Sequence, residues 1–363
     1  MRFITLDVFR GMTVFLMIVV NTPGSGAIPY PQLLHAEWHG CTLTDLVFPG
    51  FLFAVGNAIG FSSKNKSLAK IIRRSLTIFI IGFLLTWLAS IYIGNDWSFS
   101  FTPLQRVRYL AVLQRIGLAY GIAAILALYL SDKQIIIISG SILIIYWLIL
   151  NFAGDPQQEY TIMGNAVRKL DILLLGENHL YKEKGIVFDP EGLLSTLPAV
   201  VSVTIGHLTG KLIRREGKTY TCIAKLFIAG SLLMLAGLVW SLGFPLNKKL
   251  WTSSFVLFTS GIFISVTGLL FWFYEIKEKK LASYFFSVFG KNALFIYILA
   301  TLLGVIFLIP ANANENIYEY INNSLFQRMA PGPLGSLLFA ISFTMLCWMV
   351  GYLLDKRKIY IRV

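Results

Sequence analysis

The chain has 363 residues, of which 56% are hydrophobic and only 13% are charged. Soluble domains carry about 25% charged residues, so this composition, with several apolar runs of about 18 residues or more, excludes a soluble globule and a disordered chain. Lys and Arg number 31 against 18 Asp and Glu, a formal net charge of +13. A nucleic-acid-binding protein would cluster such charge on one water-exposed face, so the distribution of the basic residues decides what the charge means.

Ten apolar segments are long enough to cross a bilayer, because a helical span needs about 20 residues. The sequence therefore predicts an all-α polytopic membrane protein with about 10 transmembrane helices, forming a single domain over residues 1–363. Charged residues interrupt the N-terminal segment and no small-residue cleavage site follows it, so we expect it to be retained rather than removed as a signal peptide. The expected spans lie near residues 4–22, 44–62, 71–93, 108–130, 134–152, 193–213, 222–243, 252–273, 285–309 and 334–354.

The connections between these spans predict the orientation of the chain. If both termini are cytoplasmic, the inner side carries about two thirds of the 31 basic residues, including those of KNKSLAKIIRR and KLIRREGKTYTCIAK. Short loops rich in Lys and Arg stay on the cytoplasmic side, so we expect cytoplasmic termini, a surrounding lipid bilayer and no nucleic acid partner. The outer connections contain aromatic residues, Gly and Pro, and we expect them to form folded outer loops over an outward-facing site. They lie near residues 22–43, 94–107, 153–192, 244–251 and 310–333.

The first span carries polar residues that are costly in a bilayer and therefore candidates for function. Asp7 and Arg10 are i,i+3 neighbours and can pair, although Arg10 alone could also extend to the inner interface. Arg10 and Asn21 are eleven residues apart, about three turns and roughly 16 Å along the axis. Eleven steps return to nearly the same azimuth, so both residues face one groove. A phosphate-bearing cofactor with a long flexible arm could lie along that groove.

The segment before the second span contains two histidines, His35 and His39, which would be i,i+4 neighbours in a helix with Glu37 between them. We expect no metal site here, because metalloproteases use the order H-E-x-x-H and catalytic zinc needs a third ligand. One histidine can instead act as a general base or nucleophile, oriented by a carboxylate such as Asp45 or Glu37. The alternative is structural: loop histidines that cap the second span, and Asp45 as its N-terminal carboxylate.

Polar residues also occur in the fourth and sixth spans. Arg108 and Arg115 are seven residues apart and would share a face of a helix that begins near residue 108. Arg115 lies deeper and needs a partner or a cavity, and Gln114 adds an amide beside it. In the sixth span, Ser195 can bond its own backbone, and a lone histidine such as His207 is typical of an interhelical donor.

Several of these stretches resemble a known family. They are LDVFRGMTVFLMIVVNTPG, HAEWHGCTLTDLVFPGFLF, VLQRIGLAY, FDPEGLLSTLPAVVSVTIGHLTG, NKKLWTSSFVLFTSG and FGKNALFIYIL. The chain is similar over nearly its whole length to the transmembrane acetyltransferases related to heparan-α-glucosaminide N-acetyltransferase, especially to their short bacterial homologues. His35 matches the family's catalytic histidine and Asn21 its active-site asparagine, whereas His39 stands where the family often has Asn. The Arg10-x10-Asn21 spacing also resembles the R-x10-H signature of the broader membrane acyltransferase group, with Asn in place of His.

The resemblance implies acetyl transfer from cytoplasmic acetyl-CoA to the amino group of a glucosamine-type sugar on the outer side of a bacterial inner membrane, by a homodimer. Because the extra luminal domain and first span of the lysosomal enzymes are lacking, we expect a smaller glycan than heparan sulfate. We expect His35 to be the general base or a transient acetyl carrier, and Asn21 to polarise the thioester, with Asp45 beside them. Donor binding is expected from Arg10, Gln114, Arg115 and Ser195, and acceptor binding from Glu37, Trp38 and His39.

Two other functions are compatible with the same residues. Intramembrane Arg and Asp could serve a transporter of sugars or glycan fragments, although no inverted repeat is visible in the sequence. O-acetylation of a surface glycan would keep the mechanism and change only the acceptor.

Overall fold

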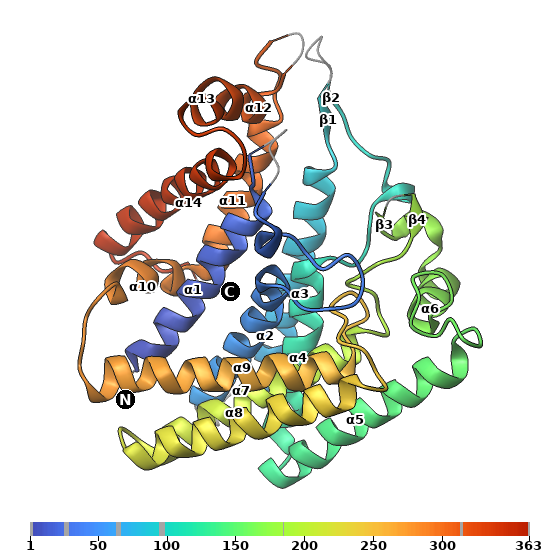
Figure 1. Ribbon diagram of the computed structural model, residues 1–363, viewed down its shortest axis with the longest axis vertical. Coiled ribbons are helices and arrows are strands. Elements are labelled where there is room, and N and C mark those ends of the chain that lie inside the picture. Colours follow the sequence, from blue (N-terminus) through green and yellow to red (C-terminus); the bar gives the residue numbers. More distant parts are fainter. Residues whose placement is uncertain are drawn as a thin grey trace.

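A computed structural model describes residues 3–24, 29–62, 67–93, 99–183, 185–312 and 315–361. Parts of the expected inner connection at 63–66, of the outer connections at 25–28, 94–98, 184 and 313–314, and of both termini lie outside the described residues. The helices are α1 (Ile4–Asn21), α2 (Leu43–Phe61), α3 (Leu68–Ala89), α4 (Val112–Tyr129), α5 (Asp132–Ala153), α6 (Ala166–Leu175), α7 (Thr196–Glu216), α8 (Tyr220–Ser241), α9 (Ser253–Phe271), α10 (Ser283–Lys291), α11 (Ala293–Phe307), α12 (Ile317–Ile321), α13 (Gln327–Met329) and α14 (Pro333–Lys356) (Figure 1). Two short antiparallel pairs, β1 (Tyr92–Ile93) with β2 (Phe99–Ser100) and β3 (Lys182–Glu183) with β4 (Ile186–Val187), lie in the loops.

The number of spans agrees with the sequence. Within the described ranges, nine helices are long and apolar enough to cross a membrane, and α10 with α11 makes a tenth if the bent pair is one span. The prediction of an all-α polytopic membrane protein is confirmed. The cytoplasmic location of both termini stays a prediction.

The ninth span, predicted as one segment over residues 285–309, is wrong as a continuous helix. It is bent by 81° between α10 and α11. Asn292 leaves the helical region at the break, with φ −121° and ψ 37°. Its amide Nδ2 donates to Ile359 O at 3.1 Å and its Oδ1 accepts from Ile361 N at 2.9 Å. The Asn292 side chain thus supplies hydrogen-bond partners to the backbone of the C-terminal tail at the break between α10 and α11.

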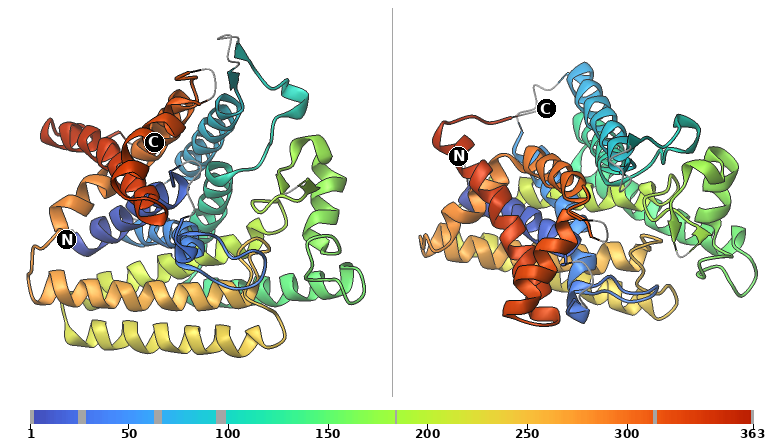
Figure 2. Two further views of the ribbon diagram at one scale, coloured as in Figure 1. Left: turned by 45° about the horizontal axis from the view of Figure 1, so that its top comes forward. Right: turned by 90° about the horizontal axis from the view of Figure 1, so that it is seen from above.

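The helices lie at steep angles to one another, and the elements around the site come from both ends of the chain. Figures 1 and 2 show α8 and α9 side by side beneath α1 and α2. α6 and the β3–β4 hairpin lie at the end of the bundle opposite the N-terminus (Figure 1). This arrangement separates the end that contains the N-terminus of α1 from the end that contains the long connections.

Glycines allow the helices that carry the candidate site residues to touch through their backbones. A Cβ atom at Gly56 of α2 would lie 1.9 Å from Val203 O of α7, and one at Gly206 of α7 would lie 2.2 Å from Phe53 O. On α1, a Cβ at Gly11 would lie 1.8 Å from Phe286 O of α10. Small residues drive such close packing in a bilayer, where apolar burial gives little net gain. The contacts therefore determine the relative positions of α1, α2 and α7.

The contact between α2 and α7 can be tested with a matched pair of glycine substitutions. We expect Gly56→Ala to destabilise the protein by about 1–3 kcal/mol, because the added methyl group overlaps a backbone carbonyl that cannot rotate away. Gly140→Ala in α5 should be neutral or slightly stabilising, since nothing lies within 4 Å of its added Cβ. Thermal unfolding of the two purified variants measures the difference, and equal unfolding temperatures would contradict the proposed backbone contact.

Candidate active site

A cavity of about 370 Å³ lies where the connections predicted to be outside meet the helix ends, and for this reason it is called the outer cavity. The last turn of α1, the first turns of α2 and the loop between them form one side of it. The other side comes from three distant connections and from α11. The lining residues include Met17, Val20, Asn21, His35, Thr44, Phe48, Arg108, Val112, Tyr181, Glu183, Glu191, Lys248, Lys249 and Tyr297. The structure thus brings Asn21 and His35, the two residues singled out by the motifs, to one outer cavity.

His35 is held by the buried carboxylate of Asp45. His35 Nδ1 lies 2.7 Å from Asp45 Oδ1, and Asp45 is 1% exposed whereas the His35 side chain is 41% exposed. An ionised carboxylate only accepts hydrogen bonds, so Nδ1 carries the proton and donates it. The other ring nitrogen, Nε2, is then the basic one, and it is the one available to a ligand in the cavity.

Asp45 also caps α2, so it makes both of the contacts that the sequence left open. Its Oδ2 accepts from Thr42 N and from Ala36 N, each at 3.0 Å. Thr42 and Asp45 form a capping box, with each side chain bonded to the backbone of the other residue. One carboxylate therefore bonds the loop backbone, caps the N-terminus of α2 and orients the imidazole of His35.

His35 and His39 would be i,i+4 neighbours only in a helix, and the segment that carries them is not helical. The short helix before them covers only Pro31–Leu33, and residues 34–40 are bends or irregular. The amide of Ala36 is taken by Asp45 instead of by a helical carbonyl. Gly40, with φ +119°, turns the chain away and donates to Leu246 O at 2.8 Å. No group of three or more His, Cys, Asp or Glu able to hold a metal ion occurs among the residues described.

Lys248 is a neighbour of His35 that was not predicted from the sequence. Its Nζ lies 3.3 Å from His35 Nε2. Burial lowers the pKa of Lys248, and the carboxylates of Glu191 and Asp45 oppose that shift. A signal for this site was available, because Lys248 and Lys249 are adjacent cations in a connection predicted to lie outside, where Lys is depleted.

Arg108 joins the loop before α4 to the segment before α7. Its Nε donates to Asp189 Oδ2 at 2.8 Å, and its Nη2 donates to Asp189 Oδ1 at 2.6 Å and to Glu191 Oε2 at 2.5 Å. Burial alone would lower the pKa of Arg108, but these two carboxylates raise it above its ordinary value. Burial would likewise raise the pKa of Glu191, and the charge of Arg108 lowers it instead.

The prediction that Arg108 and Arg115 share a helical face is also wrong, because α4 begins only at Val112. The loop before α4 is held by a distant part of the chain, because Tyr109 N donates to His179 O at 3.1 Å. Both arginines nevertheless reach the same segment. Arg115 is fully buried, and its Nη2 donates to Gly192 O at 3.0 Å and to the Ser195 hydroxyl.

Arg115, Ser195 and Gln114 line neither the cavity that contains Asn21 and His35 nor the cavity around Arg10. Arg115 and Ser195 bond each other, and the Arg115 guanidinium lies over the Trp251 ring at 5.1 Å. Gln114 Nε2 donates to Thr86 Oγ1 at 3.3 Å. Donor binding by these three residues stays a prediction, and the structure gives them contacts within the bundle.

Glu37, Trp38 and His39, predicted to bind the acceptor, lie beside the cavity rather than in its lining. Trp38 Nε1 donates to Tyr160 O at 2.6 Å, and His39 Nδ1 lies 3.3 Å from Asn247 Nδ2. Burial lowers the pKa of His39. Their role in acceptor binding stays a prediction.

A second cavity, of about 640 Å³, lies toward the N-terminal end of α1 and is called the inner cavity because the sequence predicts that this end is cytoplasmic. Its lining includes Asp7, Arg10, Arg74 and Lys291. The expected pair between Asp7 and Arg10 is present at 4.0 Å, and Arg10 Nη1 also donates to Gly290 O at 3.1 Å. Lys291 Nζ donates to Asp355 Oδ1 at 2.8 Å. Three cations thus surround this inner cavity.

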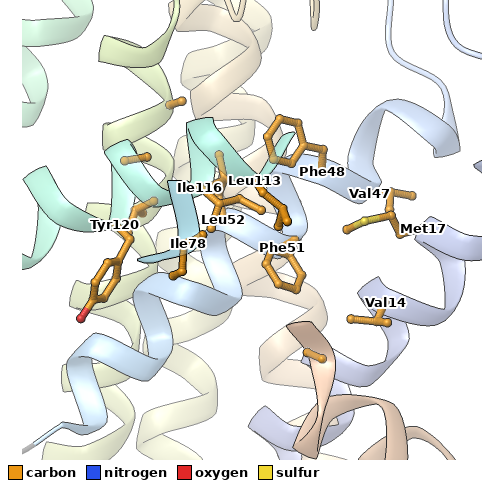
Figure 3. Packing of buried hydrophobic residues seen from close by; sticks show 14 of the residues in the cluster. Val14, Met17, Val47, Phe48, Phe51, Leu52, Ile78, Leu113, Ile116 and Tyr120 are labelled. Carbon is orange, nitrogen blue, oxygen red and sulfur yellow. The ribbon is translucent and has the colours of Figure 1, made fainter. Parts of the chain in front are cut away.

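The two cavities follow the same helices. α1, α2, α4 and α11 line the outer cavity with Met17, Phe48, Val112 and Tyr297, and the inner cavity with Arg10, Phe51, Leu113 and Leu294. On α2 and α11 the two linings are three residues apart, about one helical turn or less. Figure 3 shows Phe48 and Phe51 between Leu113 on one side and Met17 on the other. A short layer of packed side chains therefore separates two cavities that lie in line.

This fold and these cavities define a multi-pass membrane protein in which His35, held by Asp45, lines one cavity and a second, basic cavity lies toward the N-terminal end of α1. The catalytic-region model of heparan-alpha-glucosaminide N-acetyltransferase matches residues 2–175, which include Asn21, His35 and Asp45. The proteins of Mus musculus and Homo sapiens with that name are each 28% identical to the chain, over 81% and 82% of it and 52% of their own lengths. The chain spans about half the length of these curated relatives. The family model over residues 2–175 and these two relatives support the family resemblance that the motifs predicted.

The ion pairs of Arg108 give a stability prediction with a defined pH dependence. Arg108→Gln leaves two buried carboxylates without their partner, and we expect a loss of about 3–5 kcal/mol at pH 7.5. The pKa of Glu191 lies below its ordinary value of 4.5 in the folded protein. Its contribution is therefore present above pH 4.5 and is lost as the pH falls through the lowered pKa. The difference between wild type and variant should shrink by pH 4.

Thermal unfolding at both pH values measures this difference. Arg106→Gln is the matched control, since Arg106 is exposed and makes no ion pair with any residue that the structure describes. A deficit in Arg108→Gln that is equal at both pH values, or equal to that of the control, would contradict the assignment.

Proposed function

We propose that this chain transfers an acetyl group from cytoplasmic acetyl-CoA to the amino group of a terminal glucosamine-type sugar on the other side of a bacterial inner membrane. One observation supports this most strongly: Asn21 and His35, which Asp45 holds, line an outer cavity that lies in line with a basic inner cavity. The names of the mouse and human relatives support an N-acetyl product on a glucosaminide. A homodimer is part of the same proposal.

The residues of the inner cavity fit the donor. Coenzyme A carries several phosphate groups, and Arg pairs with phosphate through charge-assisted hydrogen bonds. Arg10, Arg74 and Lys291 supply three cations at one cavity of about 640 Å³. Arg10 and Asn21 are eleven residues apart on α1, roughly 16 Å along its axis. A pantetheine arm held at Arg10 would therefore bring its thioester toward Asn21.

The outer cavity supplies the groups that amide formation needs. The lone pair of the sugar amine attacks the thioester carbon; a C–N bond forms, the C–S bond breaks, and its electrons leave with the thiolate. The amine proton passes to His35 Nε2, while Asp45 keeps the proton on Nδ1 and the ring in place. The amide of Asn21 donates to the thioester oxygen as negative charge develops there. His35 can then return the proton to the thiolate, which balances the reaction.

Lys248 occupies the position next to His35 that the acceptor amine would take. In the structure its Nζ is within hydrogen-bonding distance of His35 Nε2, the atom that has to receive the amine proton. A bound sugar amine would take that position and displace Lys248 toward Glu191, whose carboxylate already faces this cavity. Direct transfer and a route through acetylated His35 use the same side chains.

Two alternatives make different predictions about acceptors. An O-acetyltransferase would use the same His–Asp pair on a hydroxyl group, and would acetylate N-acetylglucosamine as fast as glucosamine. A transporter of glycan fragments would move sugar into proteoliposomes that contain no acetyl-CoA. Amine-dependent product formation by the purified protein distinguishes the proposed function from both.

The catalytic role of His35 can be tested against a histidine in the same loop. We expect His35→Gln to lower kcat for acetyl transfer from acetyl-CoA to a glucosamine-ended oligosaccharide by about 10²–10⁴-fold, because the general base is lost. His39→Gln should change kcat by less than about threefold and act mainly on KM for the sugar. Initial rates with labelled acetyl-CoA measure both effects. Wild-type kcat in His35→Gln would overturn the assignment of the base.

A further inference from the structure

A third cavity, of about 450 Å³, lies among the ends of α2, α3, α4 and α7 at the end of the bundle that the basic loops predict to be cytoplasmic. One part of its lining is basic and comes from α7: His207, Lys211, Arg214 and Arg215. The other part is apolar and includes Ile71, Ala124, Ala127 and Leu128. It shares Ile59 and Ser62 with the inner donor cavity as a common wall. The acetyl-transfer proposal uses none of its four basic residues.

The basic residues form a row along α7. His207, Lys211 and Arg214 stand at positions i, i+4 and i+7, so they share one face and extend over roughly 10 Å of the helix axis. His207 is 6% exposed, and its Nδ1 has no hydrogen-bond partner among the described residues. Lys211 pairs with Asp132 at the start of α5. The row thus runs from a buried ring nitrogen to cations at the helix end.

The outermost cations of the row are accessible. Arg214 is exposed and makes no ion pair with any part of the chain that the structure describes, whereas Arg215 donates to Glu216 Oε1 at 3.1 Å. Ala127 and Leu128 on the opposite wall are only half-buried. Since both belong to a helix that is long and apolar enough to cross a membrane, we infer that this wall borders the bilayer.

We propose that this cavity binds an anionic phospholipid of the cytoplasmic leaflet. The phosphate is held by Arg214 and Lys211, an ester carbonyl accepts from His207 Nδ1, and an acyl chain lies against Ala127 and Leu128. Basic pockets between transmembrane helices on the cytoplasmic side recognise such headgroups. A ligand with phosphate at one end and an apolar chain at the other matches the order of groups along the row. The proposal does not depend on acetyl transfer.

The phosphates of coenzyme A have similar chemistry, and the common wall at Ile59 and Ser62 makes them the competing source. Two features favour the lipid. The cavity has a half-buried apolar wall on the membrane side, and the three cations of the donor cavity, Arg10, Arg74 and Lys291, lie on the other side of that common wall. Competition between the two ligands distinguishes them.

The test is lipid binding to the full-length protein, measured by native mass spectrometry with phosphatidylglycerol or phosphatidylcholine added. We expect one phosphatidylglycerol to bind wild type, with phosphatidylcholine at least about tenfold weaker. Arg214→Ala should weaken phosphatidylglycerol binding by about tenfold, because one charge-assisted contact is lost. Lys133→Ala is the control, since it removes an exposed cation at the start of α5 outside the cavity lining.

A second variant tests the buried part of the row. His207→Leu should also weaken phosphatidylglycerol binding, and an unchanged unfolding temperature shows that the helix packing is intact. Added coenzyme A should leave the bound lipid in place. Equal binding by Arg214→Ala and Lys133→Ala, equal binding of the two lipids, or displacement of the lipid by coenzyme A would each overturn the proposal.

Discussion

The buried carboxylate of Asp45 connects the fold of this protein to its candidate chemistry. A charged group at 1% exposure is costly unless all its oxygen atoms are bonded. Here the ring of His35, the amides of Ala36 and Thr42 and the Thr42 hydroxyl supply those bonds. The same contacts cap the N-terminus of α2 and fix the conformation of the loop before it. A change that moves the helix start therefore also moves the imidazole.

The opposite wall of the outer cavity depends on arginines in the same way. Arg108 and Arg115 both bond the segment Asp189–Ser195, the first from a loop and the second from within α4. That segment carries Glu191 to the cavity and leads into α7. Since α7 packs on α2 through glycine backbones, both walls belong to one rigid frame. Such support around a reacting group keeps it in a productive geometry.

Sequence alone predicted the spans well, because a bilayer permits few backbone structures and long apolar runs are unmistakable. It also predicted Asn21 and His35 as site residues, and the structure places both at one cavity. Asp45 both contacts His35 and caps α2, because the loop returns to the start of its own helix.

The failures came from contacts that join distant parts of the chain. The break at Asn292 depends on the backbone of Ile359 and Ile361, nearly 70 residues away. The loop conformation of Arg108 depends on Asp189, 81 residues away, and the periodicity of the residues near Arg108 does not predict this contact. Lys248 reaches His35 from 213 residues along the chain. In each case one partner of the polar contact lies far away in the sequence, so the hydrophobic periodicity around the other partner cannot predict the contact.

In the proposed function, the helices that line both cavities, α1, α2, α4 and α11, pass an acetyl group from a donor on one side of the membrane to an acceptor on the other. Purified protein in sealed proteoliposomes tests this directly, with labelled acetyl-CoA enclosed and a membrane-impermeant, glucosamine-ended oligosaccharide outside. The account predicts labelled N-acetylated product outside the vesicles with wild type and none with His35→Gln. Product that forms only when donor and acceptor share one compartment would contradict it.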